Sequence, residues 1–449
     1  MNRILIVLLI LSVLTPTLFA QTNEKATLTF KEAVKIGLEN NVILNQQKNQ
    51  LNYTQTNKTA SLLQLGPSVD ANLNAYRNDG NSFNQQEGRV VNGKIDYVNG
   101  SINANVPIFN GLNILNQYKQ ANNQNEAQLH LVAQSSQDVI RDIANQYLNC
   151  LLDQELIEID EENVAAQQLQ YDQIKAQVDV GSKAEADLFN QEYQLKNAEL
   201  LLVRSRIRLR NDLATLALTL QIDPEVYFEV AQVDWDINEI AADNLSVPDL
   251  YAVAKERRSD LKRADFAEKA ARFGYASLKG RYFPSIYAGA SYGSRYNYIY
   301  GESNRSFDEQ FRNDNTQFGY GLSMSIPIFY GMRYRAQAAQ SKVTYENAKL
   351  LEKDTEVRVK SEVISAYQNF NDAKANYDAS AAQLRAAELT YKTEKERYDL
   401  GISNMVQLTT TNQDYVKAKG DFESAKFTLM FQKLLINYAT GTLKIEDIP

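Results

Sequence analysis

The chain has 449 residues, a formal net charge of −8 and a sequence pI of about 5.1. An acidic chain is poorly suited to bind a phosphate backbone, so we expect no nucleic-acid partner. The single cysteine excludes an internal disulfide, and the single histidine excludes most zinc sites and Ser-His-Asp triads. The composition therefore indicates no metal site and no cofactor.

Residues 1–20 have the pattern of a secretory signal peptide. Arg3 provides a positive charge, residues 4–14 form a short apolar run, and Ala20 is a small residue before the expected cleavage site. The apolar run is too short for a spanning helix, and no cysteine lies near it to accept a lipid anchor. No later run approaches about 18 apolar residues, so we expect no transmembrane helix.

The first element after the signal peptide is a predicted helix. From Thr27 onward apolar residues recur at intervals of three and four, and the pattern ends at Pro67. These residues are Leu28, Ala33, Ile36, Leu44 and Leu51. The spacing predicts one amphipathic helix of about 38 residues.

Two strands follow, because apolar residues then alternate with polar ones. Every second residue is apolar from Val69 to Ala75 and again from Ile102 to Ile108. We predict strands over about 68–78 and 97–109. The residues between them are rich in Asn, Gly and Gln, so we expect a long polar loop over about 77–96.

A long helix is predicted over about 111–180, where proline is absent. Apolar or aromatic residues stand seven apart along it: Ile143, Cys150, Ile157, Val164, Tyr171 and Val178. This period is typical of a left-handed coiled coil and would place Cys150 in its packed seam. Such a helix is about 100 Å long. It ends at Gly181, a residue suited to a left-handed cap, and a return helix is expected over about 184–222.

The whole pattern occurs twice. The phrase V/I-P-I-F-x-G spans residues 106–111 and 326–331, at an offset of 220 that also relates Gly181 to Gly401. Upstream the offset is 217, as for Pro67 and Pro284. We infer a tandem duplication of about 200 residues, with repeats over 21–245 and 246–449.

The second repeat predicts the same elements. Strands are expected over about 285–300 and 316–329, a long helix over about 331–400 and a return helix over about 405–438. The six heptad positions again hold apolar or aromatic residues: Val363, Phe370, Tyr377, Leu384, Tyr391 and Tyr398. The acidic segment 223–250 breaks the helical pattern, and we expect a small side structure there.

The strands indicate an oligomeric membrane barrel. In the last strand, large apolar residues from Phe318 to Ile328 alternate mainly with Gly and Ser, so one face is apolar and the other small or polar. A bilayer accepts only closed barrels, of at least eight strands, whereas one chain supplies four. Two copies give an eight-strand barrel, and side chains fill its interior. Three copies give twelve strands around a duct. With the helices as a tube beneath the barrel, this architecture predicts a conduit.

These features together resemble the TolC-type outer-membrane efflux family. They are the opening LTFKEAVKIGLENN, the paired V/I-P-I-F-x-G, the two glycine turns, and NYATGTL near the end. The resemblance implies an α+β membrane protein, a homotrimer whose shared twelve-strand β-barrel continues into a long periplasmic helical tunnel. It also implies docking to a periplasmic adaptor and an inner-membrane pump or transporter, and thus a passive exit duct for efflux or type I secretion.

The resemblance assigns roles to turns and junctions. The turns at Gly181 and Gly401 would meet the adaptor's hairpin. The prolines and glycines that flank the strands would form the helix–barrel junctions: Pro67, Pro107, Gly111, Pro284, Pro327 and Gly331.

It also implies a gate. Asp187 and Tyr398 match a linked pair across the coil, while Ser403 stands where the family has a basic residue. Gln407 and Thr410 occupy the constriction positions that are acidic in the family's best-known member. From the residues alone, Asp187 is equally well a first-turn carboxylate favoured by the helix dipole, and Tyr398 a seam residue of the coiled coil.

Two other classes of function stay open at this stage. A periplasmic coiled-coil scaffold or adaptor would account for the helices but not for four strands with alternating faces. A glycan-acting enzyme needs paired carboxylates in a cleft, and the acidic residues form no fixed pair outside solvated helix faces. We therefore expect no enzymatic activity.

Overall fold

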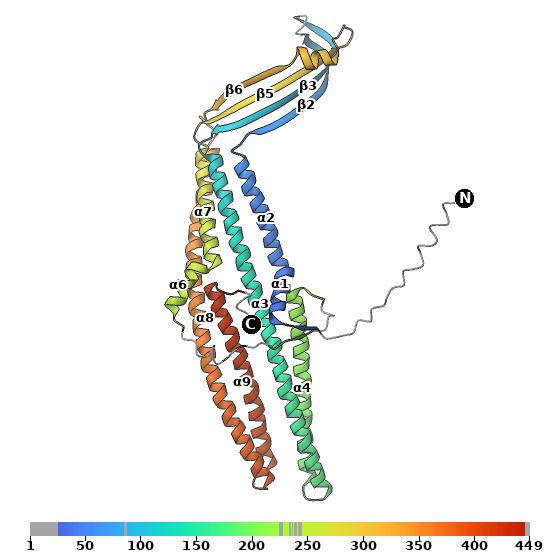
Figure 1. The fold of residues 1–449 in the computed structure, drawn as a ribbon, viewed down its shortest axis with the longest axis vertical. Coiled ribbons are helices and arrows are strands. Elements are labelled where there is room, and N and C mark those ends of the chain that lie inside the picture. The colour runs from blue at the N-terminus through green and yellow to red at the C-terminus, as the bar shows by residue number, and fades with distance from the viewer. Residues whose placement is uncertain are drawn as a thin grey trace, which may run out of the picture.

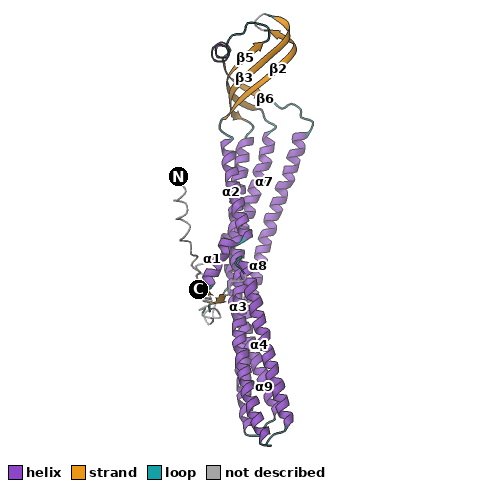
Figure 2. Ribbon diagram, turned by 90° about the vertical axis from the view of Figure 1, so that its right-hand side faces the viewer, coloured by secondary structure: helices purple, strands orange, loops and turns teal. Residues whose placement is uncertain are grey.

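The computed structural model describes residues 26–84, 88–223, 228–232, 235, 237, 240 and 245–444, so the predicted signal peptide lies outside these ranges. The protein is an elongated helical body with a curved β-sheet at one end (Figure 1). Figure 2 shows helices and strands in separate regions, apart from a short strand pair at mid-height.

Each repeat has one long helix with shorter helices packed along it. The first repeat contains α1 (Phe30–Asn40), α2 (Val42–Leu63), α3 (Asn113–Asp179) and α4 (Glu185–Leu220). The second contains α6 (Val247–Arg257), α7 (Ser259–Gly280), α8 (Arg333–Asp399) and α9 (Met405–Thr440). In Figure 1, α2 runs beside the upper half of α3 and α4 beside its lower half. None of the described helices combines the length and apolar character needed to cross a bilayer.

The coiled-coil prediction is confirmed by burial. None of the heptad residues of α3 and α8 is exposed, and Ile143, Cys150, Val363 and Phe370 are at most 1% accessible. Burial raises the pKa of the Cys150 thiol to about 12, so this cysteine is a packed core residue.

The prediction of one continuous helix before the first strand was wrong. At Asn41 the backbone leaves the helical region (φ −56°, ψ 123°), and its side-chain oxygen accepts a hydrogen bond from the Leu44 amide at 2.9 Å. Asparagine is a favoured N-cap, so it ends α1 and starts α2. The second repeat breaks 217 residues later, at Arg258 (φ −59°, ψ 122°).

A small sheet holds the first described residues against the middle of α3. Strand β1 (Ala26–Leu28) pairs in parallel with β4 (Phe228–Val230), from the segment where a side structure was expected. The Tyr147 hydroxyl lies 2.8 Å from the Leu28 carbonyl oxygen and 2.7 Å from that of Ala231. Its ring packs 5.1 Å from Phe30, at the centre of the main hydrophobic core.

The large sheet has four antiparallel strands in the order β2-β3-β5-β6. They are β2 (Ser68–Asn84), β3 (Arg89–Phe109), β5 (Ser285–Ile299) and β6 (Gln317–Ser325). The polar loop predicted over 77–96 was wrong for most of that range, because β2 and β3 pair continuously from Ser68↔Asn105 to Asn84↔Arg89. Whereas β2 and β3 are longer than predicted, β6 is shorter than the strand expected over 316–329.

Candidate functional site at the hairpin tips, the waist and the sheet

Both long helices end in the same backbone turn. After α3, the Gly181 amide donates to the Val178 carbonyl and the Ser182 amide to the Gln177 carbonyl, each at 2.8 Å. These two bonds form a Schellman motif, which requires a left-handed residue at the glycine. The turn after α8 repeats both bonds at the 220 offset, and φ is +76° at Gly181 and +71° at Gly401.

A cation joins the two tips. The Lys183 ammonium lies 4.2 Å from the Tyr398 ring centroid and donates a hydrogen bond to its hydroxyl, which links the α3–α4 turn to the end of α8. Asp187 lies in the first turn of α4 and is half-buried. Within the described chain, no hydrogen bond or ion pair joins Asp187 to Tyr398. In this single chain, the side chain that contacts Tyr398 across the two tips is Lys183.

Gln407 and Thr410 lie three residues apart at the start of α9, and both are exposed. The Gln407 amide donates to the Asn404 side-chain oxygen at 3.0 Å, which caps the helix. The Thr410 hydroxyl donates to the Val406 carbonyl at 2.9 Å. This surface of the tip therefore presents neutral dipoles.

Sequence reasoning missed a buried carboxylate at the second tip. Glu394 is only 5% exposed, and its oxygens accept hydrogen bonds from Arg397, at 3.0 Å, and from the Ser403 hydroxyl. In the first repeat the equivalent positions hold Ile174 and Lys183. The signal was present in the sequence, because a charged residue replaces an apolar one between the two repeats.

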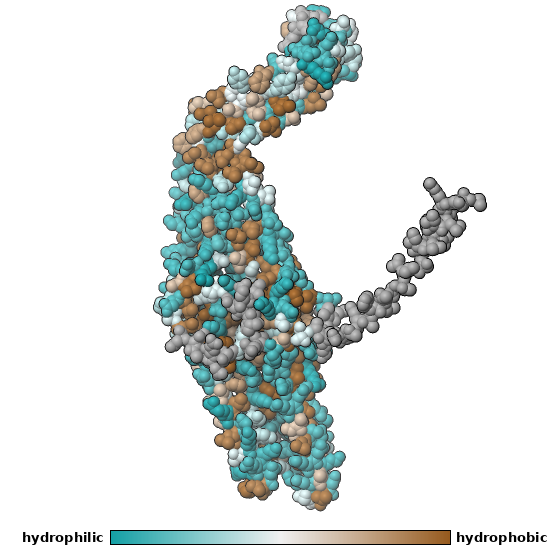
Figure 3. All heavy atoms as spheres, in the orientation of Figure 1, coloured by the Kyte–Doolittle hydropathy of each residue, from teal (hydrophilic) through white to brown (hydrophobic). Residues whose placement is uncertain are grey.

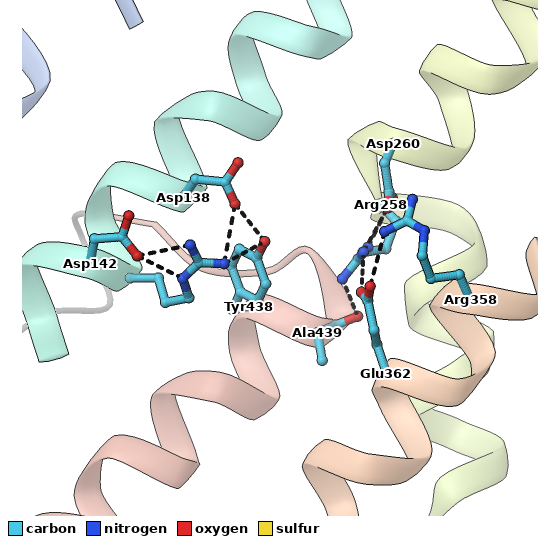
Figure 4. Close-up of polar contacts among 9 residues, drawn as sticks. Asp138, Asp142, Arg258, Asp260, Arg358, Glu362, Tyr438 and Ala439 are labelled. Atoms are coloured by element: carbon cyan, nitrogen blue, oxygen red, sulfur yellow. Dashed lines mark hydrogen bonds and ion pairs between the residues drawn. The ribbon is translucent and has the colours of Figure 1, made fainter. Parts of the chain in front are cut away.

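At mid-height, the break between α6 and α7 carries a buried ion-pair cluster (Figure 4). Arg258 binds Asp260 through two hydrogen bonds, at 2.9 and 2.6 Å, and Glu362 of α8 at 2.6 Å. Arg358 approaches both carboxylates, Asp260 at 3.5 Å and Glu362 at 3.0 Å. Burial raises the pKa of Asp260, but the hydrogen bonds and charges of the two arginines outweigh this and leave it below its ordinary value.

A second cluster beside it connects α3 to α9. The Tyr438 hydroxyl donates to Asp138 at 2.5 Å, and the Arg141 guanidinium lies 4.8 Å from the Tyr438 ring centroid. Arg141 also binds Asp142 at 2.8 Å. We call the two clusters together the waist. Its buried charges are all paired, so they fix where four helices meet.

A third polar group, below the waist, is incompletely paired. Asp153 of α3 is 3% exposed, one of its oxygens has no hydrogen-bond partner, and Arg208 of α4 lies 3.9 Å away. Burial, together with the neighbouring Asp212, raises the pKa of Asp153 to about 7. Among the described residues, no group of His, Cys, Asp and Glu side chains is arranged to hold a metal ion.

The sheet has one apolar and one polar face. The register aligns Leu73, Ile102, Tyr292 and Phe318 on one side, and Phe318, Tyr320 and Leu322 are 69%, 84% and 77% exposed. On the other side, the Asn103 side chain donates to Asp70 at 3.0 Å. Figure 3 shows hydrophobic residues gathered on the lower part of the sheet and hydrophilic ones at its upper end. This division is the pattern of a barrel strand set, lipid on one face and water on the other.

All the predicted junction residues except Pro107 lie between a strand and a helix. Pro67 and Pro284 immediately precede β2 and β5. Gly111 and Gly331 have φ of +63° and +56° and precede α3 and α8. A Cβ at Gly111 would lie 2.0 Å from the Gly280 carbonyl oxygen, so that junction is closed against α7, whereas Gly331 faces open space.

The two prolines of the repeated phrase differ. Pro107 lies inside β3, next to a register shift between residues 107 and 109. Pro327 lies beyond the end of β6.

Comparisons with known proteins agree with this architecture. A family model described as outer membrane efflux protein matches residues 34–220 and 250–426, one match in each repeat. The outer membrane protein TolC of Salmonella enteritidis is 23% identical over 316 residues, which are 70% of this chain and 62% of TolC. The chain thus spans somewhat less than two thirds of that relative's length.

Two further relatives extend the match. The outer membrane efflux protein BepC of Brucella suis biovar 1 (strain 1330) is 22% identical over 349 residues, covering 77% of this chain and 73% of BepC. The crystal structure of the outer membrane protein VceC from Vibrio cholerae superposes with a TM-score of 0.79 and 14% identity, over 92% of this chain and 96% of VceC. The fold is therefore that of VceC along nearly the whole chain.

Proposed function

Because the chain belongs to the outer membrane efflux protein family, a family of outer-membrane channel proteins, we propose that three copies form a passive exit duct from the periplasm to the exterior. The duct would serve a tripartite efflux system or a type I secretion system. Its helical body extends into the periplasm and its sheet lies in the outer membrane. No chemical step is required of the chain in this role.

One observation supports this proposal above all others, the open sheet. Among the described residues of one chain, β2 and β6 are the outer strands of the sheet, so each leaves one edge of backbone N–H and C=O groups without a strand partner there. Inside a bilayer each unsatisfied group costs several kcal/mol, and only a closed barrel avoids that cost. The edge of β6 in one copy and that of β2 in the next would close the barrel. Three copies give twelve strands, enough for an open interior, whereas eight would be filled by side chains.

The test combines mass with conductance. The full-length protein is extracted from the membrane in mild detergent, weighed by native mass spectrometry, and reconstituted into planar bilayers. A trimer that conducts ions supports the duct. A stable monomer or dimer, or a trimer without conductance, contradicts it.

We also propose that the tips bind the partners. The turns at Gly181 and Gly401 would dock a periplasmic adaptor, which joins the duct to an inner-membrane pump or transporter. Both glycines are exposed, and a Cβ at either would meet no other atom. Replacement by valine would therefore strain only the left-handed backbone, by roughly 1–2 kcal/mol.

The double variant Gly181→Val with Gly401→Val should still form an inserted trimer but lose export in cells. Asparagine tolerates the left-handed region, so Gly181→Asn with Gly401→Asn is the matched control and should retain export. Unchanged export by the valine variant would remove the docking assignment.

A further inference from the structure

Residues 302–315, most of the segment between β5 and β6, lie against the apolar face of the sheet and the edge of β5; we call them the strap. It contains a short π-helical turn, η1 (Glu309–Asp314). A Cβ at Gly100 would lie 2.8 Å from the Phe311 ring and 3.6 Å from the Leu73 side chain. Gly100 and Leu73 are paired residues on the apolar face, so Phe311 covers that face and not the polar one.

Aromatic rings attach the strap to the sheet. The Phe307 ring stacks on Phe311 with centroids 5.0 Å apart and meets the edge of Tyr296 at 5.1 Å. Tyr296 lies on the apolar face, opposite Val98. The inner side of the strap is therefore apolar.

Side-chain amides of the strap take the place of a strand. The β5–β6 pairing ends at Gly293↔Gln317, and beyond it the part of the chain that the structure describes places no strand on this upper edge of β5. The Asn304 side chain donates to the Ile299 carbonyl and accepts from its amide, both at 2.7 Å. Gln310 makes the same two bonds to Asn297, at 3.0 and 3.1 Å.

Asn315 completes this set by donating to the Arg295 carbonyl at 2.9 Å. Gln310 is only 3% exposed, so at least this part of the edge is shielded from water. An edge in open water could be hydrated, whereas an edge next to the hydrocarbon core must be satisfied by the protein.

The outer side of the strap is charged. Arg305 pairs with Asp314 at 2.7 Å, and Arg312 pairs with Asp308 at 3.1 Å, with both arginine side chains largely exposed. The strap thus has an apolar side that faces the sheet and a charged side that faces away from it.

The strap also lies at a boundary on the sheet. Below it, β6 presents Phe318, Tyr320 and Leu322. On the same face, and level with the upper part of the strap, Arg77 forms two hydrogen bonds to Asp96, which pairs with Tyr298; they are 2.6 and 2.9 Å long, and this ion pair is unsuited to hydrocarbon. Aromatic side chains with polar neighbours are typical of this transition from lipid to water.

We propose that the strap lies in the head-group layer of the outer leaflet and seals the upper edge of β5 from the lipid side. This proposal rests on the proposed function, because it needs the apolar face of the sheet to contact lipid. It assigns the strap to the membrane surface and not to the mouth of the pore.

The test uses tryptophan as a depth probe in the full-length protein. Trp235 is the only tryptophan, so Trp235→Phe provides a background without one. Phe307→Trp is introduced and the protein is reconstituted into phosphatidylcholine vesicles brominated either near the carbonyls or near the chain ends. The head-group position predicts quenching about twofold stronger by the shallow bromines than by the deep ones. Arg312→Trp, on the outer side of the strap, should give the same order.

Two neighbours on β6 serve as controls. Leu322→Trp should be quenched more by deep bromines, and Ser323→Trp, on the opposite face, by neither lipid. If brominated lipid quenches Leu322→Trp but neither strap variant, the strap proposal is overturned, whereas the proposed membrane face of the sheet is supported. If Leu322→Trp fails to respond as well, both the strap and the proposed membrane face are overturned.

Discussion

Asp153 makes the stability of the helical body depend on pH. An aspartate in an unfolded chain has a pKa of about 3.9, whereas in the folded protein the pKa of Asp153 is about 7. The folded state therefore holds this proton more tightly. Its contribution to stability is fully present below about pH 4 and is lost as the pH rises through 7.

We predict that Asp153→Asn removes this loss. Three pKa units correspond to about 4 kcal/mol, and water penetration reduces this, so we expect the variant to gain about 2 kcal/mol over the wild type at pH 8. Thermal unfolding followed by circular dichroism at pH 5 and pH 8 measures the effect. The unfolding temperature of the wild type should be lower at pH 8 than at pH 5. The unfolding temperature of the variant should differ less between the two pH values. Glu161→Gln, at an exposed ion pair of α3, is the control; a wild-type-like pH slope in Asp153→Asn would contradict the assignment.

Single residues were the hardest feature to predict from the sequence. The left-handed turns at Gly181 and Gly401 were expected, because helices commonly end at a glycine in the left-handed conformation. The contact of Lys183 with Tyr398 joins residues 215 apart in the chain, and no periodicity relates them. The Arg258 cluster was not predicted for the same reason, since Glu362, which pairs with Arg258, lies on another helix.

At the scale of elements, helices were predicted better than strands. The proline-free helical patterns that end at Gly181 and Gly401 located α3 and α8 to within a few residues, and the heptad pattern predicted which of their residues are packed. The first helix was predicted without its break, since Asn41 is one polar residue within an otherwise regular spacing. The upper parts of β2 and β3 are polar, and alternation predicts a strand only where one face is apolar.

Strand β6 provides the element-scale prediction. Leu322→Arg places a charge on the apolar face near its middle, where lipid contact makes it cost about 2–4 kcal/mol. Ser323→Arg is its matched control on the opposite face, where water is available. The yield of heat-resistant oligomer from membranes should drop strongly for Leu322→Arg and little for Ser323→Arg. Equal losses would mean that the two faces of the sheet are assigned the wrong way round.

At the scale of the whole molecule, the duplication predicted the architecture. Each local pattern is weak alone, but the offset of 220 shows that the same order of patterns occurs twice. The four strands of one chain are too few to close a barrel, so several copies of the chain are required. The number of copies follows from the need for an open interior and not from any residue of this chain. The substrate and the partners depend on surfaces of other proteins, so no pattern in this sequence identifies them.

The assembled tip should bind multivalent cations weakly. If Gln407 and Thr410 face the pore, each copy contributes two neutral side chains to it. Gln407→Asp with Thr410→Asp in three copies would instead place six carboxylates around one narrow opening, a strong site for such ions. In single-channel recordings, hexaamminecobalt(III) added from the tip side should block the double variant at concentrations about tenfold lower than the wild type.

The control for this prediction is Gln407→Asn with Thr410→Asn, which adds no charge and should behave like the wild type. If the wild type is already blocked as tightly as the aspartate variant, these two residues do not line the constriction.

The near-identical backbone turns of the two hairpins have a consequence for symmetry. In a trimer, six tips of similar backbone shape would surround one axis, so the ring has approximate six-fold symmetry in its main chain. Its side chains have only three-fold symmetry, because Lys183 on one tip alternates with Ser403 on the next. A partner that recognises the glycine turns would find six equivalent places to bind, whereas one that recognises charge would find three.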